Sequence, residues 1–110
     1  MFAMKIQMDE EKILREDVIN LKKVYAALDK IFAKHNLVKG ETEPDGTLTY
    51  LGTESNKDFG NFCSVASNLK RVNTWFAPNC KKWLWGDDET IPNVWDWEDV
   101  LEQMRERGQL

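Results

Sequence analysis

The clearest pattern of apolar and polar positions lies between Asp17 and His35. Apolar side chains recur there at intervals of three and four residues, and charged side chains fall largely between them. The positions that carry this period are Val18, Leu21, Tyr25, Leu28 and Phe32. Because the spacing places one broad apolar stripe on a helix, we predict an amphipathic helix over residues 17–35. Asn36 is a suitable left-handed residue for ending it.

Two further segments show a helical period. Ser55 is a candidate cap, and the apolar stripe that starts at Phe59 predicts a helix over residues 56–70. A third stripe follows the candidate cap Asp96 and predicts a helix over residues 96–107. Its apolar side chains are Trp97, Val100, Leu101 and Met104.

Extended segments flank a Pro-Asp-Gly turn sequence at residues 44–46. Proline presets φ, aspartate bonds to the backbone and glycine accepts a positive φ, so we predict a β-hairpin over residues 37–52. Alternation at residues 72–76 favours a short third strand, and Pro78 fits the first turn of a short helix that carries Cys80, Trp83 and Leu84, so we predict the strand followed by this helix. We interpret residues 86–93 as a loop.

Together these segments predict an α+β fold in one domain that spans residues 1–110. We expect a small antiparallel sheet of two or three strands, packed with three helices. The weak pattern of the first eight residues predicts partial disorder there. A chain of 110 residues has the length of one domain and can bury one modest core.

The net charge of −4 arises entirely from residues 80–110, which contain four basic and eight acidic side chains. Direct nucleic-acid binding favours a basic face, so this distribution argues against it. It favours a basic protein partner, or a purely solvating role. No apolar run has the length of a membrane span or a secretory signal. We therefore expect a soluble cytoplasmic protein of bacterial type, without a membrane partner.

Residue patterns for catalysis and metal binding are weak. His35 is the single histidine, and Cys63 and Cys80 form no CxxC pair. A zinc site needs clustered ligands and a calcium loop needs acids at alternate positions, and neither pattern is present. Phosphate-binding glycine motifs are also absent. We therefore predict no catalytic residue, no metal and no cofactor, and interpret both cysteines as reduced thiols.

All five tryptophans lie within the 23 residues from Trp75 to Trp97. Trp83 and Trp85 are too close in sequence to share one helical stripe, so we expect at least one to be partly exposed. Indole rings beside carboxylates are typical of protein interfaces, although the alternative is that all five close over one small core. The predicted interface consists of Trp75, Trp83, Trp85, Asp87, Asp88, Glu89 and Trp95.

The favoured hypothesis is a non-enzymatic protein-interaction module, of the kind found among inhibitors, immunity factors and mobile-element proteins. An exposed aromatic patch equally serves a homodimer. The alternative is a small-molecule-binding domain or a small enzyme, with an aromatic-lined pocket near Cys80 or His35. A third hypothesis is mimicry of DNA by the acidic face.

Overall fold

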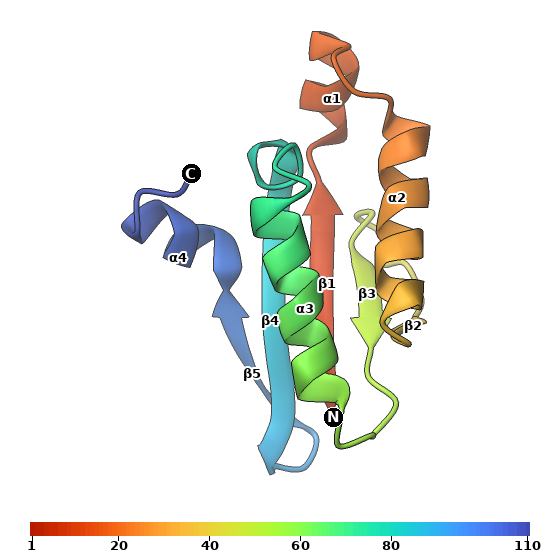
Figure 1. Cartoon of the computed structure of the whole chain (residues 1–110), viewed down its shortest axis with the longest axis vertical. Helices are drawn as coiled ribbons and strands as arrows, with labels where there is room; N and C mark the ends of the chain where they lie inside the picture. The colour runs from red at the N-terminus through yellow and green to blue at the C-terminus, as the bar shows by residue number, and fades with distance from the viewer.

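The first element of the chain, β1 (Phe2–Met8), is the central strand of a five-stranded antiparallel sheet. The computed structural model describes the whole chain of 110 residues. β1 pairs with β3 (Leu48–Leu51) on one side and with β4 (Cys80–Ile91) on the other. β2 (Val38–Lys39) and β5 (Val94–Asp99) form the two edges, which gives the order β2-β3-β1-β4-β5 (Figure 1).

Four helices complete the fold. α2 (Leu21–Lys34) and α3 (Asp58–Arg71) lie against the same face of the sheet (Figure 1). α1 (Glu10–Glu16) connects β1 to α2, and α4 (Val100–Glu106) follows β5 at one edge of the sheet. A single 3₁₀ turn, Ala77–Asn79, precedes β4. None of the helices has the length and apolar composition that crossing a bilayer requires.

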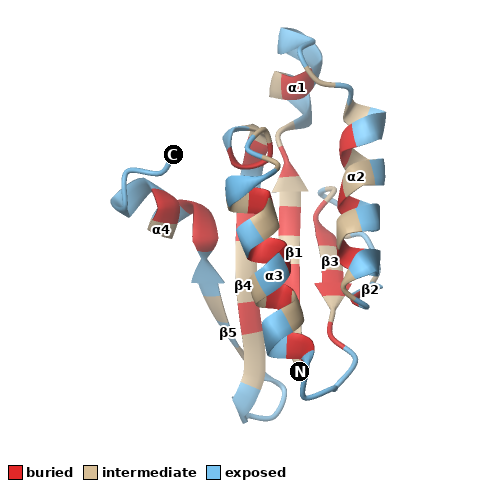
Figure 2. Ribbon diagram, in the orientation of Figure 1, coloured by how far each residue is buried: buried red, intermediate tan, exposed pale blue.

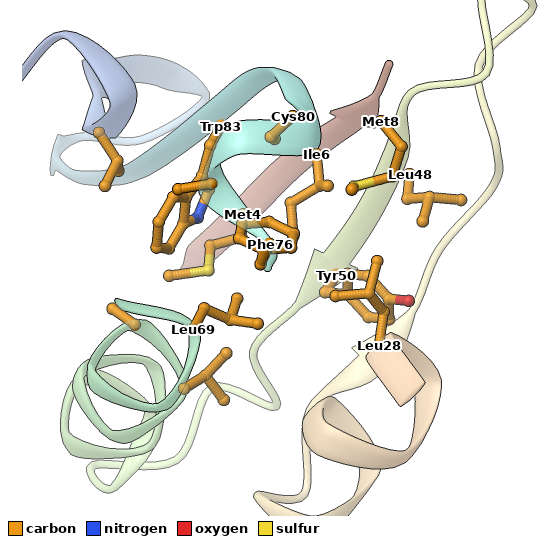
Figure 3. Close-up of a cluster of buried hydrophobic side chains, with 14 of the residues drawn as sticks. Met4, Ile6, Met8, Leu28, Leu48, Tyr50, Leu69, Phe76, Cys80 and Trp83 are labelled. Atoms are coloured by element: carbon orange, nitrogen blue, oxygen red, sulfur yellow. The ribbon is translucent and has the colours of Figure 1, made fainter. Parts of the chain in front are cut away.

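The core lies between the sheet and the two long helices α2 and α3 (Figure 2). Alternate side chains of β1 enter it from the middle of the sheet, and these are Met4, Ile6 and Met8 (Figure 3). Tyr50 of β3 stacks on Phe32 of α2, with ring centroids 3.7 Å apart. Trp83 of β4 meets Phe76 edge-on, with ring centroids 5.0 Å apart. Large aromatic rings from both flanks of β1 therefore close one continuous core.

No helix covers the opposite face of the sheet. Cross-strand partners share a face, and the register Ala3–Gly86–Trp97 places the Trp97 ring on the open one. That ring stacks on Trp95, with centroids 5.1 Å apart, and its centroid lies 5.4 Å from Nζ of Lys5. The open face therefore carries a stacked indole pair beside a charged side chain.

The prediction of a sheet with two or three strands is wrong, because two segments assigned to other structures are strands. Residues 1–8, expected to be partly disordered, contain the central strand β1. Residues 80–99, expected to contain a short helix, a loop and the start of the last helix, form the hairpin of β4 and β5. β1 and β4 pair with each other across most of the chain, and a local pattern does not reveal such distant partners.

The prediction of three helices is also wrong, because α1 is a fourth. It is capped by Asp9, whose side chain accepts a backbone hydrogen bond. The last helix begins later than predicted, at Val100, because Asp99 is its cap and Trp97 belongs to β5. Residues 72–76 form turns instead of the expected strand.

The segments with the strongest local patterns agree with the structure. The helix predicted over residues 17–35 is α2, which begins later than predicted, at Leu21, and leaves Val18 exposed outside it; Asn36 after the helix is left-handed, with φ of 60°. The helix predicted over residues 56–70 is α3. The hairpin predicted over residues 37–52 is formed by β2 and β3, and Gly46 in its turn has φ of 86°.

Candidate functional site

Three aromatic side chains from three elements meet at the end of the sheet where the chain begins. The ring centroids of Phe2 in β1 and Phe59 in α3 are 5.8 Å apart. Those of Phe59 and Trp85 in β4 are 5.7 Å apart. Phe59 is 58% exposed, which is unusual for so large an apolar side chain. Exposed rings already held by neighbouring rings lose little conformational freedom when they contact a partner.

The start of α3 determines the position of Phe59. Asp58 is only 2% exposed, and its Oδ1 accepts a hydrogen bond of 3.1 Å from the Thr53 hydroxyl. The same carboxylate lies against the backbone of Gly52, where an added Cβ would be 2.5 Å from Oδ2. A larger residue at position 52 would therefore displace the first turn of α3, and Phe59 with it.

Carboxylates on the hairpin of β4 and β5 border these rings. Asp87 and Asp96 are directly opposite each other in the register, and Glu98 is opposite Trp85. None of the three carboxylates forms an ion pair within the chain. Like charges directly opposite each other reduce the stability of a sheet, and here no cation compensates them.

A hollow of about 120 Å³ lies between the rings and the carboxylates. Its lining residues are Phe2, Phe59, Trp85, Gly86, Asp87, Asp96 and Glu98. A second hollow of about 500 Å³ shares Phe2 and Phe59 with the first and extends toward Glu54 and Glu89. We define the acidic-aromatic surface as the side chains of Phe2, Phe59, Trp85, Asp87, Asp96 and Glu98.

The neighbouring acids Asp88 and Glu89 have a different environment. The α-ammonium of Met1 lies 2.7 Å from Oδ1 of Asp88 and 2.8 Å from Oε1 of Glu89. Hydrogen bonds to these carboxylates raise the pKa of that α-amino group to about 10. The ammonium, together with the backbone N–H of Asn93, holds the pKa of Asp88 below its usual range. Of the three adjacent acids, only Asp87 lacks a cationic partner.

The structure separates the tryptophans of the predicted interface. Trp83 is 0% exposed, so its ring belongs to the core. Trp75 lines a different hollow, of about 430 Å³, together with Val18 and Val24. Trp95 stacks on Trp97 over the open face of the sheet. From the predicted set, the structure brings together only Trp85 and Asp87 in the acidic-aromatic surface.

Sequence reasoning missed four residues of the acidic-aromatic surface: Phe2, Phe59, Asp96 and Glu98. Phe59 was assigned to the buried stripe of its helix, but its position in the first turn leaves it beside the end of the sheet. A usable signal existed for the acids, since Asp96 and Glu98 alternate with Trp95 and Trp97 in the period of a strand.

The two cysteines and the histidine lie away from the hollows. Cys80 is in the core, and its Sγ donates to the backbone oxygens of Gln7 at 3.5 Å and Lys82 at 3.1 Å. Burial raises the pKa of this thiol to about 12. None of the five principal hollows is lined by Cys63, Cys80 or His35. No group of three or more His, Cys, Asp or Glu side chains is placed to hold a metal ion.

No protein-family model, curated protein or solved structure matches this chain.

Proposed function

We propose that this protein is a non-enzymatic protein-interaction module that binds a basic protein through the acidic-aromatic surface. The observation that carries the proposal is the exposed Phe59 ring, packed on Trp85 and bordered by the carboxylates of Asp87, Asp96 and Glu98, which form no ion pair within the chain. Aromatic anchors contribute much of the binding energy at protein interfaces, and surrounding charges select the partner and accelerate encounter.

The charge distribution supports a basic partner. The last 31 residues carry the whole net charge of −4, and three of their acids are in the acidic-aromatic surface. Glu54 and Glu89 extend the negative surface along the adjoining hollow. A partner with Lys or Arg side chains around an apolar patch would match both features.

A reducing compartment is the expected location. Cys63 and Cys80 are both free, and proteins of the cytoplasm keep their thiols reduced. A small acidic module in the bacterial cytoplasm would fit an inhibitor, an immunity factor or a mobile-element protein, by analogy at the level of class alone. The competing hypothesis, a ligand pocket near Cys80, gains no support from the hollows described above.

The test compares capture of lysate proteins by the wild type and by a Phe59→Ala/Asp96→Lys double variant. The matched control is Leu14→Ala/Glu16→Lys on α1, which also removes one exposed apolar side chain and reverses one exposed acid. Circular dichroism checks that both variants fold. We expect the surface variant to lose a basic protein that the control variant still captures.

Equal capture of the same proteins by both variants would show that this surface is not the binding site. Loss of a captured protein by the control variant alone would place the site on α1 instead. A light-scattering mass at two concentrations distinguishes binding to a different protein from formation of a homodimer.

A further inference from the structure

We propose that the small hollow of the acidic-aromatic surface is the binding site for one arginine side chain of the partner protein. This inference rests on the proposed function and specifies the chemistry of its contact. It is carried by two observations: a pair of opposed, uncompensated aspartates, and three aromatic rings that line the same hollow.

The aspartate pair places two like charges opposite each other in the sheet. Asp87 and Asp96 occupy directly opposed positions of an antiparallel pair, where Cβ atoms are about 4.5–5.5 Å apart. Glu98 adds a third carboxylate to the same hollow. No Lys, Arg or His of the chain lies within ion-pairing distance of these groups. A cation bound between these carboxylates would reduce their mutual repulsion.

The lining favours an organic cation. Phe2, Phe59 and Trp85 contribute aromatic surface, which attracts a flat, weakly hydrated cation more than it attracts a hydrated metal ion. The volume of about 120 Å³ suits the end of one side chain, not a whole ligand. A guanidinium group stacks on aromatic rings and donates in parallel to carboxylates, whereas the ammonium of lysine is a strongly hydrated point charge. Arginine therefore matches this hollow better than lysine does.

The first measurement addresses the repulsion in the free protein. Asp96→Asn keeps the size of the side chain and removes one charge of the opposed pair. We expect its midpoint of thermal unfolding to rise by about 1–5 °C at low salt, and the rise to shrink at high salt. Glu41→Gln is the control, since Glu41 is exposed and has no ion pair, and its midpoint should stay unchanged. An unchanged or lower midpoint for Asp96→Asn overturns the premise of an uncompensated pair.

The second measurement addresses the ligand. N-acetylarginine amide is titrated into the ¹⁵N-labelled protein, with N-acetylcitrulline amide as the uncharged analogue and N-acetyllysine amide as the other cation. We expect saturable shifts of the Trp85 indole N–H for the arginine probe, with a Kd on the order of millimolar. The indole N–H of Trp95, on the other face, should not shift. Asp96→Asn should weaken binding about fivefold, as expected for one exposed charge pair.

The outcomes separate this inference from the proposed function. Equal shifts for the arginine and citrulline probes overturn the arginine site, and stronger shifts for lysine replace arginine with lysine. Loss of the captured protein in the Phe59→Ala/Asp96→Lys variant, combined with no arginine binding, leaves the proposed function standing without this contact. Specific arginine binding combined with unchanged protein capture keeps the site and removes its assignment to a protein partner.

Discussion

Gly86 lies beneath the indole ring of Trp97, with no room for a side chain between them. A Cβ at position 86 would be 2.5 Å from Cε3 of Trp97 and 2.6 Å from the backbone oxygen of Asp96. The absence of a side chain at Gly86 therefore lets the edge strand β5 carry Trp97 on the open face of the sheet. The same strand pairing places Asp96 and Glu98 beside Trp85 on the other face.

Gly86→Ala should lower the free energy of unfolding by about 1–3 kcal/mol, because the added methyl group meets backbone as well as the indole ring. Urea unfolding followed by circular dichroism measures the loss. The matched control is Gly60→Ala in α3, where nothing lies within 4 Å of the added Cβ. That change should raise the free energy of unfolding by about 0.5–1 kcal/mol, because alanine is the better helix former. Equal effects of the two changes would contradict the close contact at Gly86.

The tryptophans should contribute unequally to stability. Trp83→Ala should cost about 3–5 kcal/mol, because it empties the space of a fully buried ring against Phe76. Trp95→Ala should cost about 1 kcal/mol, because this ring is half-buried and mainly contacts Trp97. Denaturant unfolding of the two variants checks the difference. A larger loss of unfolding free energy for Trp95→Ala than for Trp83→Ala would contradict the structure, because it would place the core on the face that carries Trp95.

Cys80 should resist alkylation in the folded protein. Burial raises the pKa of its thiol from about 9 to about 12, and only the thiolate reacts quickly. Iodoacetamide at pH 8, followed by mass spectrometry of the peptides, should label Cys80 only after unfolding. The half-exposed Cys63 serves as the internal comparison. Rapid labelling of native Cys80 would instead favour the hypothesis of a pocket with a reactive thiol.

The same raised pKa predicts how stability depends on alkaline pH. The unfolded thiol loses its proton near pH 9, whereas the folded thiol keeps it until about pH 12. The contribution of the buried Cys80 thiol to the free energy of unfolding is therefore complete below about pH 9 and declines as the pH rises toward 12. Cys80→Ala should make the alkaline loss less steep, which urea titrations between pH 8 and 11 can measure. An identical slope for wild type and variant would show that the folded thiol ionises normally.

Tyr50→Phe should lower the free energy of unfolding by about 1–2 kcal/mol. The buried Tyr50 hydroxyl donates a hydrogen bond of 2.7 Å to Oδ1 of Asp29, and the variant loses this bond while its ring still stacks on Phe32. Tyr25→Phe is the comparison, because the Tyr25 hydroxyl bonds Glu10 at an exposed position and its loss should cost less. Thermal unfolding of both variants measures the difference. If Tyr50→Phe and Tyr25→Phe unfold at the same midpoint, the hydrogen bond of Tyr50 contributes no more to stability than the exposed bond of Tyr25.

The sequence by itself determined the elements whose stabilising pattern is local. The apolar stripe of α2 has a period of 3.6 residues, and its end requires only Asn36 to adopt a positive φ. The turn at residues 44–46 is stabilised by its own residues, because Oδ1 of Asp45 accepts a hydrogen bond of 3.0 Å from the backbone N–H of Thr47. These features depend on residues a few positions apart, so they are visible along the chain.

The tertiary structure alone decided the central position of β1, the hairpin of β4 and β5, and the acidic-aromatic surface. β1 is stabilised by pairing with β4, about 80 residues away, and a strand gains most of its stability from such partners. Local pattern could suggest that Trp85 and Asp87 are exposed, but only strand pairing and helix packing place Phe59, Asp96 and Glu98 beside them. Contacts between distant segments form this surface, because each segment contributes one or two side chains and none contains the whole pattern.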